Sequence, residues 1–198
     1  MSELFFFAST NEGKRAEFAA LLDARGLELG APITYPEVEE SAPDYLGNAA
    51  LKASACYAEV VRLGTRATVF ADDSGLEVDA LDGAPGIRSA RYGGSDLSWA
   101  QRRARLLAAL AGVPEPGRSA RFHCALFAID GAGRIFRGFG ETRGRIAPAE
   151  CGDGGFGYDP IFIPERESRT FAEMSAAEKA SCSHRARALE ALLAAMGR

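Results

Sequence analysis

The chain has 198 residues and a formal net charge of -4 at pH 7. That length suits one well-buried core, so we expect a single domain over residues 1–198. The acidic balance argues against general binding to nucleic acid or an anionic membrane, and no apolar run approaches the ~20 residues that span a bilayer. Glu3 stands where a secretory signal carries positive charge, and the four cysteines lack a CxxC pair. We therefore expect a cytoplasmic protein without a disulfide framework or zinc site, with Cys56 and Cys124 as buried thiols.

The N-terminal part predicts a strand, a tight loop and a helix. Residues 4–9 form the apolar strand, and residues 10–13 break it. The following helix ends at Gly26, and its buried face carries Phe18, Leu21 and Leu22.

A polar, proline-punctuated segment over residues 31–44 precedes a long helix over residues 45–63. The next apolar strand, residues 67–71, ends in Asp72-Asp73-Ser74-Gly75, and residues 76–78 could extend it. Since successive strand residues point to opposite faces, the two aspartates cannot face the same way.

The second half predicts further helices and a hairpin. Residues 84–92 are expected to be loop, and a helix starts near Ser95 or Asp96 and stops at Gly112. We expect Arg102, Arg103 and Arg105 to form its solvated face.

Residues 120–129 and 134–139 flank a hairpin turn, which makes the sheet mixed, and Ile146 closes another short strand. A last strand spans residues 161–163. Capping boxes at Thr170 with Glu173 and Ser175 with Glu178 predict a helical C-terminal section to about Met196.

Two acids after an apolar strand indicate a ligand site, because open α/β sheets bind ligands at the carboxyl ends of their strands. The alternative is a polar turn. Ser9-Thr10-Asn11-Glu12-Gly13-Lys14, at a helix N-terminus, is either an anion cradle or an ordinary capped turn. It is not a Walker A loop, because its first glycine is missing.

Further cations strengthen the case for phosphate binding. Lys52 follows Asn48 by one helical turn, and Lys179, His184 and Arg185 lie where the C-terminal helices join. Acids at a strand end with lysines in separate segments are typical of a site for a Mg²⁺-bound polyphosphate. Each cation alone is more often a surface charge.

The glycine-rich run Gly154-Gly155-Phe156-Gly157-Tyr158-Asp159-Pro160 lets backbone approach a planar ligand while an aromatic ring stacks on it. The alternative is a turn with two core aromatics, which we favour for Tyr158.

In this order the motifs resemble the inosine/xanthosine triphosphate pyrophosphatases, over nearly the whole chain. The resemblance is carried by Ser9 to Lys14, Asn48-Ala49 with Lys52, Ala71 to Leu76, Pro85-Gly86 with Ser89 to Tyr92, Gly155 to Pro160, and Ser183-His184-Arg185. It implies an α/β fold with an elongated mixed β-sheet flanked by helices, two lobes with a central cleft, and a homodimer.

The resemblance also implies Mg²⁺-dependent hydrolysis of ITP, dITP or XTP to the monophosphate and pyrophosphate, which removes deaminated purines from the nucleotide pool. Water attacks the α-phosphorus, and Asp73 takes its proton and helps bind the metal. Glu40 completes the metal site, and Asp72 has a supporting role. Lys14, Lys52 and Lys179 hold the triphosphate, with contacts from Ser9, Asn11 and Ser74.

Base choice rests on hydrogen-bond polarity, because hypoxanthine and xanthine present an acceptor at position six where adenine presents a donor. The resemblance implies that His184 and Arg185 donate hydrogen bonds to that oxygen. It also implies that Phe156 stacks on the base and that Asp159 supports this contact. The chain departs from the family at Gly47, where Glu is common, and over residues 41–45. Counting back from Asn48 selects Glu40 as the metal ligand, with Glu39 as the alternative.

Two other functions compete with this interpretation. One is a Maf-like nucleotide pyrophosphatase acting on pyrimidine or modified nucleotides. The other is a nucleotide-binding module without catalysis. The sequence decides neither the preferred substrate among ITP, dITP and XTP nor how guanine is excluded.

Overall fold

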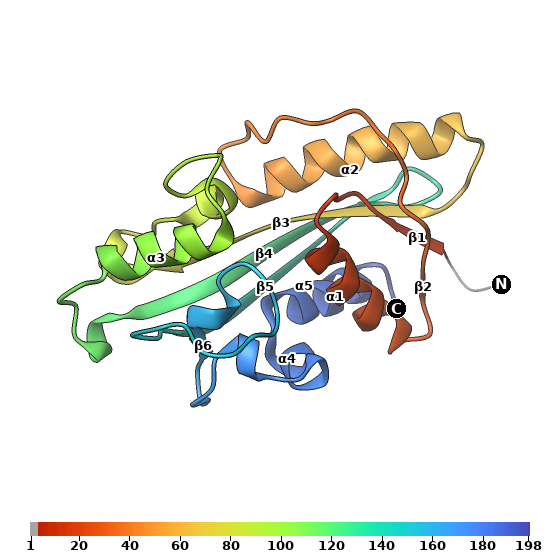
Figure 1. Cartoon of the computed structure of the whole chain (residues 1–198). Helices are drawn as coiled ribbons and strands as arrows, with labels where there is room; N and C mark the ends of the chain where they lie inside the picture. The colour runs from red at the N-terminus through yellow and green to blue at the C-terminus, as the bar shows by residue number, and fades with distance from the viewer. Residues whose placement is uncertain (1–3) are drawn as a thin grey trace. The chain divides into compact units, whose positions relative to one another are not determined.

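A computed structural model describes residues 4–198. Its centre is a six-stranded sheet with strand order β2-β1-β3-β4-β5-β6 (Figure 1). β1 pairs in parallel with β2 and β3, whereas β5 and β6 are antiparallel, so the predicted mixed α/β sheet is confirmed. The strands are β1 Leu4–Phe7, β2 Glu28–Leu29, β3 Thr68–Val78, β4 Ser119–Ile129, β5 Ile135–Ile146 and β6 Phe162–Pro164.

Every long helix predicted from the sequence is present. Asn11 caps the first and Asp44 the second, and the expected stops Gly26 and Gly64 adopt positive φ. Both C-terminal capping boxes form as predicted. The helices are α1 Glu12–Asp23, α2 Tyr45–Arg62, α3 Trp99–Ala109, α4 Ala176–Cys182 and α5 His184–Ala195.

The chain separates into two compact units. The first unit contains the residues up to Asp73, Cys124–Gly140 and Arg185–Arg198, and the second contains Ser74–His123 and Glu141–His184. In the first unit, α2 covers one face of the sheet and α1 and α5 cover the other (Figure 1). The central cleft stays a prediction.

Each unit has its own apolar core. The core of the first unit joins α2 to β3 and β4 and includes Cys56, Val60, Val69 and Phe127. The core of the second unit joins α3 to the strands and includes Leu76, Leu106, Phe122 and Phe162. Cys56 and Cys124 are buried, as predicted.

β3 continues through Asp72 and Asp73 to Val78, so the extension allowed for residues 76–78 is confirmed and the aspartates lie within the strand instead of at its end. The strand that ends near the aspartates is β1, the parallel neighbour of β3, which ends at Phe7. β1 pairs Phe7 with Phe70, and the Ala8 amide still donates to the Phe70 carbonyl, so the aspartates come just after the carboxyl end of β1. The strand-end argument therefore applies to β1.

Other boundaries also differ from prediction. β5 is one strand where two were expected, and α3 begins at Trp99 because Ser98 forms a capping box with Gln101. Residues expected as loop form a 3₁₀ helix at Gly86–Arg91, and the two-residue β2 was not predicted. Within residues 4–198, no helix combines the length and the apolar character that crossing a membrane requires.

Candidate functional site

Asp72 and Asp73 face opposite sides of the sheet, as predicted from strand alternation. Asp72 receives a hydrogen bond from Lys14 Nζ of α1 at 3.0 Å, and Arg185 Nε of α5 lies 3.7 Å from its carboxylate. Asp73 Oδ2 instead accepts from Asn48 Nδ2 of α2 at 2.9 Å. One strand thus directs its two carboxylates to different helices.

Asp72 is a buried counter-ion. Its burial would raise the pKa of the carboxyl, but the charges of Lys14, Arg185 and Lys52 outweigh that effect and bring the pKa to about 2. The carboxylate is therefore ionised at neutral pH and neutralises the basic groups around it. This position suits the supporting role predicted for Asp72.

Asp73 has the opposite tendency. Burial raises the pKa of this carboxyl, and nearby Glu40 raises it further, against the charge of Lys52 and the hydrogen bond from Asn48. A raised pKa makes a carboxylate a better proton acceptor. Of the two acids, Asp73 is therefore the one suited to activate water.

Glu40 and Lys52 meet beside Asp73. Lys52 lies on α2 one helical turn after Asn48. Its Nζ donates a hydrogen bond to Glu40 Oε1 at 2.7 Å. Burial would lower the pKa of Lys52, but Asp72, Asp73 and Glu40 together raise it. Glu39 is exposed, whereas Glu40 is half-buried. We call Glu40, Asp72, Asp73, Lys14 and Lys52 the acid–lysine cluster.

The carboxylates of this cluster fit a magnesium ion. Mg²⁺ binds through one or two carboxylates, completed by waters and substrate phosphates. Glu40 and Asp73 supply two, and a divalent cation would favour the ionised form of Asp73, whose pKa is raised chiefly by burial. Among residues 4–198 no group of three or more His, Cys, Asp or Glu side chains could hold a metal ion.

The Ser9-to-Lys14 loop is a capped helix start. Asn11 Oδ1 accepts from the Lys14 amide at 3.0 Å, and the Asn11 amide donates to Ser9 Oγ at 3.2 Å. Glu12 and Gly13 form the first turn of α1, and Thr10 is exposed. The capped-turn interpretation is thus correct, and anion binding at the same helix N-terminus stays a prediction.

In the second unit, the glycine-rich run is fixed by a buried ion pair. Lys179 Nζ of α4 lies 2.7 Å from Asp159 Oδ2, and the Phe156 amide donates to the same oxygen at 2.8 Å. The ammonium also lies 5.0 Å from the Phe156 ring centroid and 5.4 Å from that of Phe171. We call Phe156, Asp159, Phe171 and Lys179 the aromatic–lysine cluster.

Gly155 allows this cluster to form. Its φ is +67°, and a Cβ there would lie 2.2 Å from Asp159 Oδ2. Any other residue would displace the carboxylate that Lys179 binds.

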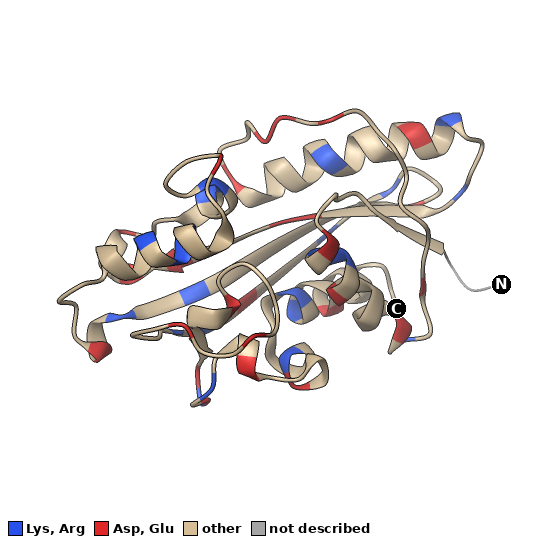
Figure 2. Cartoon of the chain, in the orientation of Figure 1, with Lys and Arg blue, Asp and Glu red and all other residues tan. Residues whose placement is uncertain are grey.

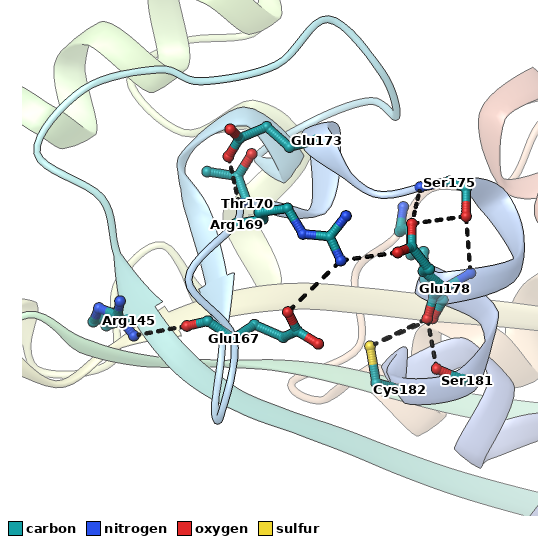
Figure 3. A network of polar contacts seen from close by, with 10 residues as sticks. Arg145, Glu167, Arg169, Thr170, Glu173, Ser175, Glu178, Ser181 and Cys182 are labelled. Carbon is teal, nitrogen blue, oxygen red and sulfur yellow. Dashed lines mark hydrogen bonds and ion pairs between the residues drawn. The ribbon is translucent and has the colours of Figure 1, made fainter.

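α4 is held in place by polar contacts near its start (Figure 3). Glu178 accepts from the Ser175 amide at 2.8 Å and pairs with Arg169 at 2.9 Å. Because Lys179 follows Glu178, this capping fixes the backbone from which the buried lysine extends.

The remaining predicted site residues of the second unit differ in their burial and in their contacts. Tyr158 is buried in the core and donates to the Ser89 carbonyl at 3.1 Å, as favoured from the sequence, and burial raises its pKa. Gly157 is buried, and Ser74 is half-buried within β3. His184 begins α5 and stacks on Phe122 at 4.6 Å, with the two rings 7° from parallel.

The structure also shows contacts that the sequence did not indicate. Arg185 Nη1 donates to Glu17 of α1 at 2.7 Å, a partner 168 positions away. Asn48, which helical spacing places on the same face as Lys52, joins Asp73 to the backbone amide of Ala42, and this link was not predicted. For Glu17 the available signal was helical spacing, because Glu17 follows Lys14 by three residues and therefore lies on the same face of α1.

The predicted solvated face of α3 is wrong for two of its three arginines. Arg102 is buried and donates to backbone carbonyls, including that of Ser95 at 2.8 Å. Arg103 donates to the Gly157 carbonyl at 2.9 Å. Arg105 is exposed, as predicted. The acceptors of Arg102 are the backbone carbonyls of Gly94, Ser95 and Leu97 in the turn before α3, which helix periodicity does not reveal.

The protein is of the α/β class, and its acid–lysine cluster combines the acids and lysines that a site for a Mg²⁺-bound polyphosphate would need. Residues 5–195 match the sequence profile of the Ham1 family, so the chain belongs to that family and the predicted relationship is confirmed.

Named relatives agree with this assignment. The chain is 47% identical over 190 residues to a dITP/XTP pyrophosphatase of Geobacillus kaustophilus, covering 93% of this chain and 90% of the relative. It resembles the solved structure of a HAM1 protein from Coxiella burnetii at 35% identity with a TM-score of 0.81, covering 98% of each chain. It also resembles a nucleoside-triphosphatase, or dITP/XTP pyrophosphatase, of Mycobacterium abscessus at 39% identity with a TM-score of 0.69, covering 96% and 98%.

Proposed function

We propose that this chain hydrolyses ITP, dITP and XTP to the nucleoside monophosphate and pyrophosphate, and so removes deaminated purines from the nucleotide pool. Membership of the Ham1 family and the names of the relatives support this activity. The observation that carries it is Asp73, a buried carboxyl with a raised pKa that lies beside Glu40 and Lys52.

Asp73 is the general base of this proposal. Asn48 holds one carboxylate oxygen at 2.9 Å, so the side chain is oriented before substrate arrives. It accepts the proton of the water that attacks the α-phosphorus. Glu40 and Asp73 would hold Mg²⁺, which supplies charge neutralisation and polarisation of the phosphate oxygens.

Lys14 and Lys52 bind the triphosphate by exchanging carboxylate partners for phosphate oxygens. Lys14 is paired with Asp72 and Lys52 with Glu40, so the acids keep both ammonium groups compensated in the ligand-free chain. Phosphate oxygens would take over part of this pairing. Ser9, Asn11 and Ser74 would add neutral contacts, and Thr10, Glu12 and Gly13 shape the loop.

The base is recognised by donors and a stacking ring. His184 and Arg185 donate to the six-oxo group, and Phe156 stacks on the purine. Lys179, predicted as a phosphate ligand, pairs with Asp159 beside Phe156. We therefore infer that Lys179 acts with Asp159 and Phe156 on the base side of the nucleotide.

The test is a substrate and product profile of the purified chain with Mg²⁺. We expect pyrophosphate release from ITP, dITP and XTP to exceed that from ATP, GTP, UTP and dTTP. Preference for UTP or dTTP would favour the Maf-like alternative. Binding of ITP without turnover would favour the non-catalytic module, and release of inorganic phosphate would reject attack at the α-phosphorus.

We also propose that the chain acts as one domain over residues 1–198, as a homodimer, in the cytoplasm. Light scattering after gel filtration tests the dimer, because a mass near that of one chain would exclude it. Fractionation of the source cells tests the location.

A further inference from the structure

A short exposed segment of the second unit carries Phe156. Residues 151–155 are all exposed, Phe156 is half-buried, and Gly157 is buried. The segment contains several glycines, which have many conformations to lose on ordering. An aromatic ring on such a segment can select a base only if something fixes the backbone that carries it.

Arg103 of α3 contacts both ends of this segment. Its Nη1 donates to the Gly157 carbonyl at 2.9 Å, and its Nη2 lies 2.8 Å from Glu150 Oε2. The Arg103 side chain is 14% exposed and Gly157 is buried, so the contact with the Gly157 carbonyl is shielded from water, whereas Glu150 is exposed. A planar guanidinium holds two acceptors in a fixed relation, which a lysine cannot do.

α3 is a rigid support for this contact. Ser98 forms a capping box at its start, and Leu106 is fully buried in the core of the second unit. The Trp99 ring packs edge-to-face on Tyr158 with centroids 5.5 Å apart, so α3 contacts the glycine-rich run at a second point. The position of Arg103 is thus set by the core.

We propose that Arg103 is a positioning residue for base recognition, because it clasps Glu150 to Gly157 and so fixes the backbone that carries Phe156 and Asp159. The activity part of this inference rests on the proposed function. Without the clasp, the segment keeps the bonds from the Gly154 amide to Ala172 and from the Phe156 amide to Asp159 but loses its tie to α3. Part of its order must then be gained when the base binds, so affinity falls while the hydrolytic step is little changed. Discrimination also falls, because a loose pocket fits wrong bases nearly as well.

The experiment compares Arg103→Met with Arg105→Met, a matched control two residues further along the same helix at an exposed position. For Arg103→Met we expect the KM for ITP to rise roughly tenfold, with kcat within about threefold of wild type and a smaller ratio of ITP to ATP kcat/KM. Hydrogen exchange of the amides over residues 151–157 should become faster without ligand. Arg105→Met should match wild type in all these measurements.

Two further variants keep the test decisive. Arg103→Lys should recover part of the KM, since one donor remains. If Arg103→Met does not fold, Glu150→Gln weakens only one end of the clasp and should still speed exchange. An Arg103→Met enzyme with wild-type KM, selectivity and exchange would overturn the inference. If wild type releases no pyrophosphate from ITP, the proposed function fails, and exchange alone decides whether the clasp exists.

Discussion

The acid–lysine cluster and the aromatic–lysine cluster are built on different kinds of backbone. Apart from Glu40, the first cluster lies on regular elements, namely β3, α1 and α2. Most of the second lies on a glycine-rich turn and 3₁₀ segments around Asp159 and Phe171, with Lys179 reaching it from α4. α2 carries both acidic and basic residues along its length (Figure 2), and of these Lys52 belongs to the acid–lysine cluster through its hydrogen bond to Glu40.

This difference fits two chemical tasks. Proton transfer needs a carboxylate held in one orientation, which a strand and a helix provide. Base recognition needs backbone that approaches a flat ligand, which glycines permit. Substitutions in the first cluster should therefore change turnover most, and those in the second should change stability and selectivity.

The largest expected effect is on turnover. Asp73→Asn removes the proton acceptor and should lower kcat for ITP by about 100-fold to 10,000-fold, with a smaller change in KM. Steady-state pyrophosphate release measures both, with the exposed Asp23→Asn as control. A kcat within tenfold of wild type would remove Asp73 from the mechanism.

Breaking the buried pair of the second cluster should mainly destabilise the fold. Lys179→Met leaves the Asp159 carboxylate, 3% exposed, without its counter-ion, so the free energy of unfolding should fall by about 3 kcal/mol. Urea unfolding measures this change. Arg169→Met, at the exposed Arg169–Glu178 pair, should cost under about 1 kcal/mol. Equal losses would contradict the distinction.

Arg185 tests whether the first unit also contributes to selectivity. Arg185→Ala should reduce kcat/KM for ITP about tenfold more than for ATP, because it removes a donor to the six-oxo group. The exposed Arg187→Ala on the same helix is the control. Equal loss for both nucleotides would show that Arg185 serves only to pair Glu17 and Asp72.

Asn48 tests how far orientation of Asp73 matters. Asn48→Ala removes the 2.9 Å hydrogen bond to Asp73, so kcat should fall about fivefold to tenfold, the effect of losing one such bond. The exposed Leu51→Ala on α2 should have little effect. Unchanged kcat in Asn48→Ala would mean that packing alone holds Asp73.

The smallest effect concerns thiol reactivity. Exposed Cys151 should react first with a thiol reagent at pH 7.5, while Cys56, whose pKa burial raises to about 11, should stay unmodified until the chain unfolds. Peptide mapping after brief labelling measures this order. Rapid modification of Cys56 would show that α2 opens in the native state.

Local patterns predicted much of the fold and part of the site. The helix caps, the hairpin and the opposed directions of Asp72 and Asp73 depend on near neighbours along the chain, which the sequence displays. The pairing of Asn48 and Lys52 with one site followed from helical spacing. These features need no knowledge of distant segments.

Features set by tertiary contacts were missed. Ser74-Gly75 has the composition of a turn, yet neighbouring strands keep β3 extended through it to Val78. Arg103 was assigned to solvent because the carbonyl that it binds lies 54 positions away. The pairing of Arg185 with Glu17 likewise requires α5 and α1 to be adjacent in space.

The central claim is that water attacks the α-phosphorus of the nucleotide. Hydrolysis of ITP in ¹⁸O-water with Mg²⁺, followed by mass spectrometry of both products, tests it directly. We predict that the label enters only the monophosphate and that pyrophosphate is unlabelled. Label in pyrophosphate, or release of labelled inorganic phosphate, would contradict the account.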